Sequence, residues 1–201
     1  MPILTLDRLG DLPASQWNAL LADSQPFVQH GFLSVLEDSG SVGPGTGWQP
    51  AHRLLVDAHG TPLAALPGYV KQHSYGEYVF DMAWADACAR AGIDYYPKLL
   101  TAVPFTPVTG ARLLGDGTLL SPLLDEISAG LPGQGLSSWH VNFTDAAADQ
   151  LLRGRDGWLE RLGCQFLWHN RGYRDFADFL DQLTSRKRKQ LRKEREQVAG
   201  Q

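Results

Sequence analysis

The sequence predicts an α+β fold, because two kinds of hydrophobic pattern alternate along its 201 residues. Short alternating or continuous apolar segments indicate strands, and longer segments with apolar residues three or four apart indicate helices. In chain order they read strand, helix, helix, hairpin, helix, strand, helix, strand, helix, hairpin. Hairpins pair strands antiparallel, whereas a helix between two strands permits parallel pairing. We therefore expect a mixed sheet flanked by helices.

The first part of the chain predicts one strand and two helices. Residues 3–6 suit a short strand, and residues 14–22 and 31–39 each place apolar side chains on one helical face. A glycine-rich stretch, residues 40–47, then runs from a helix toward a strand. Phosphate-binding glycine loops run from a strand into a helix, so we interpret this stretch as a connection.

The remaining elements follow from the same patterns and from turn residues. Residues 52–57 and 63–71 flank a turn that contains Gly60, which is typical of a β-hairpin. A helix at 83–91 and a strand at 98–103, which ends before Pro104 and Pro107, are predicted next. A helix at 118–129, a strand at 138–143 and a helix at 145–152 capped by Thr144 or Asp145 follow. The last predicted elements are a second hairpin of residues 158–161 and 164–169, a helical segment at 175–183, and a helix capped by Thr184 or Ser185 that runs to about residue 198.

Composition excludes several protein classes. With 43% hydrophobic and 20% charged residues, the chain is typical of a globular domain rather than a disordered one. No apolar run approaches the ~18 residues that cross a bilayer, and the N-terminus lacks a secretory signal pattern, so we expect a cytoplasmic protein. Cys88 and Cys164 form no CxxC motif. Cys164 and His169, five residues apart, would face opposite sides of one strand, so we predict no metal site.

Five segments carry a resemblance to a known family. They are residues 73–81 (HSYGEYVFD), 95–100 (YYPKLL), 103–110 (VPFTPVTG), 168–173 (WHNRGY) and 185–189 (SRKRK). Together they resemble the FemAB-like peptidoglycan biosynthesis family of bacteria, and the element order resembles the acyltransferase fold of the GNAT superfamily. The resemblance implies a GNAT-like mixed sheet, splayed open in its middle, over residues 1–173. Residues 174–201 would form a helical segment that contains the basic helix.

The better-known Fem proteins imply a chemistry for this chain. They carry two GNAT-like domains and transfer an aminoacyl group from tRNA onto an amine of a cell-wall precursor peptide. The resemblance thus implies an acyl- or aminoacyltransferase whose second GNAT-like domain would follow the basic helix, and an inactive isolated chain. Two other function classes stay open: a catalytically inactive GNAT-like module that binds a peptidoglycan precursor or a protein partner, and a nucleic-acid-binding module.

Polar and aromatic side chains crowd residues 73–81, directly after a predicted strand, where rigid scaffolds display binding residues. Acyl transfer to an amine requires a base and donors for a developing oxyanion. The residues that we predict to be catalytic are Glu77, Tyr78 and His73. The residues that we predict to bind substrate, in this segment and near other strand ends, are Tyr75, Asp81, Phe105, His169, Asn170, Arg171 and Tyr173. The alternative, in which Glu77 is solvated and the aromatic residues face the core, stays open.

Residues 112–117 (RLLGDG) match the spelling of the GNAT pyrophosphate loop, with Arg112, Gly115 and Gly117 as cofactor-binding positions. They precede a predicted helix, where free N–H groups and the helix dipole would meet a pyrophosphate. Asp116, however, places a carboxylate in the loop. Because the Fem proteins take their acyl group from tRNA, the resemblance favours aminoacyl-tRNA over coenzyme A, and we predict no bound cofactor.

The C-terminal helix is strongly basic, although the chain has a net charge of -4. Residues 186–201 carry a net charge of +5 and the rest of the chain -9. Four consecutive cations crowd the end of the helix where the dipole is already positive: Arg186, Lys187, Arg188 and Lys189. Because an anion would offset this repulsion, we predict that these residues bind phosphate groups of tRNA or of a nucleotide-linked precursor. A solvated arm is the alternative.

Overall fold

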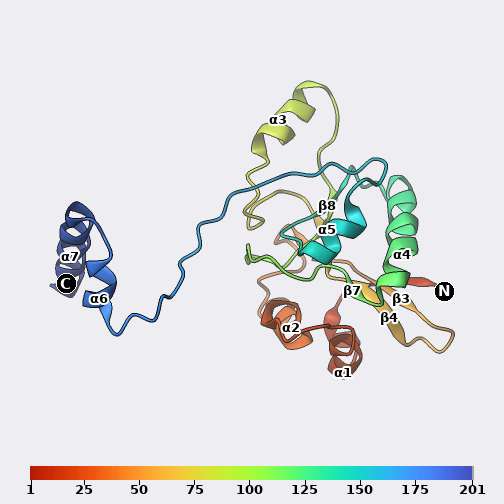
Figure 1. Cartoon of the computed structure of the whole chain (residues 1–201). Helices are drawn as coiled ribbons and strands as arrows, with labels where there is room; N and C mark the ends of the chain where they lie inside the picture. The colour runs from red at the N-terminus through yellow and green to blue at the C-terminus, as the bar shows by residue number, and fades with distance from the viewer. Residues whose placement is uncertain (201) are drawn as a thin grey trace. The chain divides into compact units, whose positions relative to one another are not determined.

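A computed structural model describes residues 1–200 of the chain. It divides into two compact units, Met1–Arg161 and Leu162–Gln201, so the division falls earlier than the predicted boundary after residue 173. We describe each unit by itself (Figure 1). Helices and two four-stranded sheets occur together, which confirms the predicted α+β class.

The first unit contains most of the predicted elements. Its strands are β1 (Ile3–Leu6), β2 (Trp48–Pro50), β3 (His52–Val56), β4 (Pro62–Leu66), β5 (Gly68–Lys71), β6 (Lys98–Thr101), β7 (Leu114–Gly115) and β8 (Trp139–Val141). Its α-helices are α1 (Ala14–Asn18), α2 (His30–Asp38), α3 (Met82–Arg90), α4 (Gly117–Gly130) and α5 (Ala146–Leu152). Asp145 is the N-cap of α5, since its side chain accepts a hydrogen bond from Ala148 N.

One bent hairpin connects the two sheets. The first sheet has the order β1-β3-β4-β7 and the second β2-β5-β6-β8. Ala51 separates β2 from β3, and Pro67 separates β4 from β5, so two strands each continue from one sheet into the other. Pro67 has no N–H to donate to a ladder, and Ala51 N instead bonds to Gly68 O at 2.8 Å. The predicted hairpin is therefore present, but it is bent in its middle.

The second sheet is mixed, as the helix between its last two strands predicts. β5 pairs antiparallel with β6, and β6 pairs parallel with β8 over three residue pairs. The two parallel segments part after Thr101 and meet again only at the isolated bridge between Gly110 and Thr144. Residues 102–109 thus leave the sheet at the point where Pro104 and Pro107 interrupt the ladder.

Alternating side chains of the hairpin build two cores. Leu54, Val56 and Ala65 pack against the helical region of α1 and α2, in a cluster that contains Trp17 and Leu33. Leu55, Ala64 and Leu66 point the other way, into a cluster with four buried residues of α4. Because successive strand residues face opposite sides, this part of the sheet is covered on both faces. α3 contributes no buried residue to either core.

The predicted second hairpin is wrong. Between Arg153 and Asp175 the described chain contains no strand, and several of its apolar side chains face solvent, with Phe166 99% and Leu162 87% exposed. The segment whose apolar alternation suggested strands therefore pairs with no other strand among the described residues. The helix expected at residues 14–22 also ends early, at Asn18.

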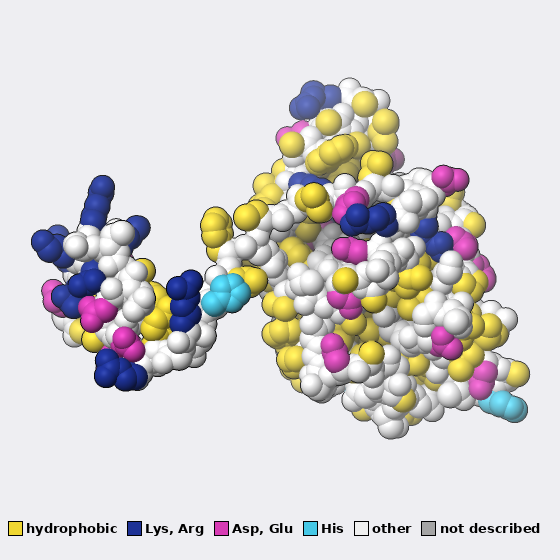
Figure 2. Space-filling model, viewed as in Figure 1, with side chains coloured by type: hydrophobic (Ala, Val, Ile, Leu, Met, Phe, Trp, Pro, Cys, Tyr) yellow, Lys and Arg dark blue, Asp and Glu magenta, His cyan; other side chains and the backbone are white. Residues whose placement is uncertain are grey.

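The second unit consists of two helices and a preceding segment. α6 (Phe176–Asp181) and α7 (Ser185–Ala199) follow the predicted positions, and Thr184 is the N-cap residue of α7. Trp168, Tyr173 and Phe179 pack ring against ring, with centroids 5.5 to 6.3 Å apart. Figure 2 shows Lys and Arg side chains gathered over this unit. No helix in residues 1–200 is long and apolar enough to cross a membrane.

Candidate functional site

The loop of residues 73–81, which joins β5 to α3, has an unusual backbone. Tyr78 and Phe80 have φ angles of 60° and 55°, in the left-handed region that disfavours residues with a side chain. Gly76 also has positive φ, and a Cβ there would lie 2.6 Å from the ring of Phe105, itself at φ 58°. Strained backbone of this kind often marks a ligand clamp or a switch.

Four charged side chains meet beneath this loop. Lys98 Nζ donates to Asp81 Oδ2 at 2.7 Å and to Glu77 Oε2 at 3.0 Å, and all three side chains are fully buried. Lys71, the Cα partner of Lys98 on the neighbouring strand, lies with its Nζ 3.5 Å from the ring centroid of Trp48. It donates to the carbonyl oxygen of Tyr75 at 3.3 Å. We call Lys71, Glu77, Asp81 and Lys98 the charged cluster.

Hydroxyl groups and a histidine complete its surroundings. Tyr95 donates its hydroxyl to Asp81 Oδ2 at 2.7 Å, and Lys98 Nζ donates to Ser74 Oγ at 3.0 Å. Ser74 Oγ also lies 2.7 Å from the hydroxyl oxygen of Tyr96. His140 on β8 packs edge-on against the Tyr95 ring. The residues that contact the loop carboxylates therefore come from the sheet and from the segment before β6.

Burial sets the protonation preferences of the cluster. It raises the pKa of Glu77, and Lys98 only partly offsets this effect. Burial also acts on Asp81, but the hydrogen bonds from Lys98 and Tyr95 outweigh it and lower the pKa of Asp81 to about 2. Burial lowers the pKa of Lys71 to about 7, and burial together with the charge of Lys98 lowers that of His140 to about 4. The two carboxyl groups thus differ in acidity although they share one ammonium group.

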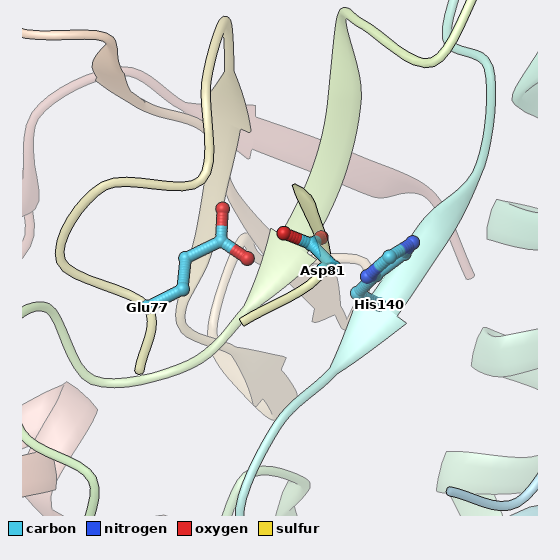
Figure 3. Close-up of side chains that lie close together, drawn as sticks. All are labelled: Glu77, Asp81 and His140. Atoms are coloured by element: carbon cyan, nitrogen blue, oxygen red, sulfur yellow. The ribbon is translucent and has the colours of Figure 1, made fainter. Parts of the chain in front are cut away.

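The carboxylates keep unused hydrogen-bonding capacity. Glu77 Oε1 and Asp81 Oδ1 are buried and have no hydrogen-bond partner among the described residues. Figure 3 shows Glu77, Asp81 and His140 close together, and one ligand atom of each lies within 4.8 Å of the others. The sequence predicted no metal site, whereas this spacing would suit a cation. The Lys98 ammonium already supplies positive charge to both carboxylates.

The structure divides the predicted catalytic residues. Glu77 lies in the charged cluster, whereas Tyr78 lies outside it and is 50% exposed. The His73 ring nitrogen Nε2 lies 3.1 Å from the Thr46 carbonyl oxygen, and the ring packs on Tyr75. The alternative that buries the aromatic residues and solvates Glu77 is wrong, because Tyr75 and Phe80 are exposed and Glu77 is buried.

Among the predicted substrate-binding residues, only Asp81 belongs to the charged cluster. Tyr75 and Phe105 lie nearby: the Tyr75 carbonyl accepts from Lys71, and the Phe105 ring packs on Trp48. The others belong to the second unit, where they do not close a strand as predicted; these are His169, Asn170, Arg171 and Tyr173. Their substrate-binding role stays a prediction, without the strand that suggested it.

Sequence reasoning missed Lys71 and Lys98 as site residues. A signal was present, since each is a charged residue at the end of a mostly apolar strand, GYVK and KLLT. A charge in such a position is rarely fully buried unless it is paired. It also missed Tyr95, Tyr96 and Ser74, whose approach depends on tertiary structure. His140 was interpreted as a core or surface group.

The residues of the predicted pyrophosphate loop already form hydrogen bonds within the chain. Arg112 is buried, where it donates to the carbonyl oxygens of Asn142, Ala111 and Val108. Gly115 N donates to Leu20 O, and the carboxylate of Asp116 caps α4 by accepting from Thr118 N. The donors that would meet a pyrophosphate, with Gly117 at the helix start, are thus largely engaged, so the structure gives the coenzyme A interpretation no support.

The positive charge of the basic helix, α7, is partly balanced by groups within its own unit. Arg188 donates to the carbonyl oxygens of Leu180, Asp181 and Leu183 at the C-terminal end of α6, and it pairs with the Asp181 carboxylate at 3.4 Å. A cation at a helix C-terminus is favourable. Arg188 is therefore engaged, whereas Arg186 and Lys189 have no ion-pair partner among residues 1–200. Lys187 makes one long contact, to Gln190.

Comparison with known proteins gives a family but no individual relative. No curated protein matches the chain, and no solved structure matches it. The sequence model of a family described as FemAB-like, peptidoglycan biosynthesis/recognition, matches residues 8–201. This match covers nearly the whole chain and includes every residue of the charged cluster. The chain therefore belongs to the FemAB-like family of peptidoglycan biosynthesis/recognition.

Proposed function

We propose that this protein transfers an acyl or aminoacyl group onto an amine of a cell-wall precursor. Membership of the family assigns it a role connected with the cell wall. The observation that carries the finer proposal is the charged cluster: two carboxyl groups of unequal acidity, two lysines and a tyrosine hydroxyl lie together beneath a strained loop. Perturbed titratable groups in such an arrangement are typical of catalytic sites.

Glu77 is the candidate proton acceptor. An amine attacks a carbonyl only after it loses its proton, and a base of raised pKa is well matched to that task near neutral pH. Glu77 has a raised pKa and a carboxylate oxygen, Oε1, that no described group occupies. Asp81, with its low pKa, would remain ionised and hold Lys98 in place. Lys98 would be the donor that stabilises the developing oxyanion.

The donor of the acyl group follows from two further features. The engaged N–H groups around Gly115 and Asp116 give coenzyme A no evident cradle. Arg186 and Lys189 on α7, which have no ion-pair partner within residues 1–200, would suit phosphate groups of an aminoacyl-tRNA. We therefore favour aminoacyl-tRNA as the donor.

A second candidate function is recognition of the precursor without catalysis. Two hollows on the surface, one beside Leu20 and Leu63 and one between α6 and α7, are lined by no residue of the charged cluster. In the form described here the cluster is also closed, because each carboxylate already binds Lys98. Both observations favour a structural role for the cluster, and the family description then leaves recognition of the precursor as the function.

A transfer assay separates the two candidates. The protein would be mixed with tRNA charged with labelled amino acids and with a UDP-linked muramyl pentapeptide. In the full-length protein we expect labelled precursor from the wild type and a loss of about 100-fold or more with Glu77→Gln. Asp86→Asn, an exposed carboxylate on α3, is the matched control and should retain activity. Precursor binding without any transfer by the wild type would refute the transferase proposal and favour recognition.

A further inference from the structure

Two lysines are buried opposite each other on neighbouring strands. Lys71 ends β5 and Lys98 begins β6, and the two are Cα partners in the antiparallel register. Neither side chain has measurable exposure to solvent. Like charges directly opposite each other on neighbouring strands repel, and a low-dielectric surrounding strengthens this repulsion. Burial lowers the pKa of Lys71 to about 7, so Lys98, whose ammonium binds both loop carboxylates, is the group that requires a negative partner here.

The 73–81 loop supplies that negative charge. Glu77 and Asp81 both bind the ammonium of Lys98, and Lys71 is held by a carbonyl oxygen of the same loop, that of Tyr75. In the described part of the chain, no carboxylate from any other segment lies within ion-pair distance of either lysine. All the acceptors for the lysine pair thus belong to one short segment without regular structure.

This loop is poorly suited to be a permanent partner. Two of its residues, Tyr78 and Phe80, adopt left-handed backbone conformations, yet their side chains are exposed, so no core packing holds them there. One oxygen of each carboxylate is buried without a partner. Strained backbone and unsatisfied buried oxygens both raise the free energy of the closed loop. The lysines, in contrast, are fixed on paired strands, so the loop is the part that can be displaced.

We propose that Lys71 and Lys98 form a binding site for a carboxylate-bearing peptide, and that the 73–81 loop occupies this site as an internal competitor. Glu77 and Asp81 stand where two carboxylates of the ligand bind, and the ligand displaces the loop. Tyr95, which now donates to Asp81, would donate to one of the ligand carboxylates. The inference concerns binding alone and holds whether or not the protein transfers an acyl group.

The donors favour carboxylate over phosphate. Phosphate sites typically use the backbone N–H groups of a helix N-terminus or nest, or the planar fork of arginine. The donors around the loop carboxylates are the Lys98 ammonium and the hydroxyl groups of Tyr95 and Ser74, and no backbone N–H among the described residues bonds to either carboxylate. The groups that now bind Lys98 are themselves two carboxylates, Glu77 and Asp81, four residues apart on one peptide segment.

The test is to remove the internal competitor. The double variant Glu77→Gln, Asp81→Asn keeps both side-chain shapes but abolishes their charges. The probe is the dipeptide Glu-Glu, titrated by calorimetry at low salt, with Gln-Gln as the uncharged control ligand. We expect the double variant to bind Glu-Glu at least tenfold more tightly than the wild type does, and the further change Lys98→Met to abolish this binding.

A matched control separates the site from overall charge. The exposed pair Asp86→Asn, Glu126→Gln changes the net charge by the same amount and should leave Glu-Glu affinity within twofold of the wild type. Equal affinity of the wild type and of a folded double variant would overturn the proposal, and so would tighter binding of inorganic pyrophosphate than of Glu-Glu.

Should the double variant fail to fold, the wild type carries the test. Saturating Glu-Glu is expected to accelerate hydrogen exchange in peptides that span residues 73–81, because the loop leaves the lysines. Unchanged exchange in this loop, at a concentration that saturates the wild type or at the solubility limit of the dipeptide, would refute the proposal.

Discussion

Replacement of Lys98 by methionine should destabilise the first unit strongly. Lys98 is fully buried and donates three hydrogen bonds of 2.7 to 3.0 Å, two of them to carboxylates that are fully buried themselves. Methionine fills similar space but leaves those two charges unpaired. Removal of one partner of a buried ion pair costs about 3–5 kcal/mol, which corresponds to a decrease in Tm of roughly 6–20 °C for a chain of this size.

Urea unfolding followed by near-UV circular dichroism would measure this loss. Arg90→Met is the control, because Arg90 is an exposed cation at the end of α3 and should change stability by no more than about 0.5–1 kcal/mol. The triple variant with Lys98→Met, Glu77→Gln and Asp81→Asn should recover much of the stability, since it leaves no unpaired charge.

Acidification gives an independent check of the same reasoning. The folded-state pKa of Asp81, about 2, lies below the ordinary aspartate value of 3.8, so its contribution to stability is fully present above about pH 4 and is lost as the pH falls toward 2. Lys98→Met lacks this contribution, so its deficit relative to the wild type should shrink over that range. A deficit below about 1 kcal/mol at pH 7, or one that does not depend on pH, would show that the carboxylates are solvated and refute the argument.

Three further predictions concern other features. The folded-state pKa of His140, about 4, lies below the ordinary histidine value of 6.5, so the wild type should lose stability as the pH falls from 6.5 to 4. Thermal melts of His140→Gln should show a flatter dependence on pH. Phe80→Gly should raise the free energy of unfolding in urea by up to about 1 kcal/mol, because φ is positive at this residue. The control Tyr75→Gly should lower it, because Tyr75 is exposed in the same loop but has no positive φ. Arg188→Gln should speed hydrogen exchange in α6 because three carbonyl oxygens lose their donor, whereas Lys189→Gln should not; equal exchange in both variants would contradict the capping role.

Sequence periodicity alone predicted most of the helices and strands. The helix patterns at 118–129 and 145–152 correspond to α4 and α5, and the hairpin at 52–71 is present because local alternation and a Gly60 turn determine it. The pattern also marked residues 73–81, since polar and aromatic side chains there exceed what a core requires. The family, too, could be identified from the sequence, because its motifs lie along nearly the whole chain.

Where periodicity was the only guide, the prediction failed or stayed incomplete. Residues 158–169 have apolar alternation but no strand, because a strand exists only where a second strand supplies hydrogen bonds. β2 was missed because three residues are too few for a period to be recognised. The compensation of Arg188 was also missed, since its partners are backbone carbonyl oxygens of α6, which no residue type reveals.

The charged cluster itself was decided by tertiary structure. In the sequence, four charged residues stand apart, and nothing in it shows that they meet: Lys71, Glu77, Asp81 and Lys98. In an unfolded chain each of them would be surrounded by water. The register of β5 with β6 places the lysines opposite each other, and the path of the 73–81 loop returns two carboxylates to them. A shift of that register by one residue would turn Lys98 to the other face of the sheet. Sequence therefore determined which groups are available, and strand register determined which of them meet.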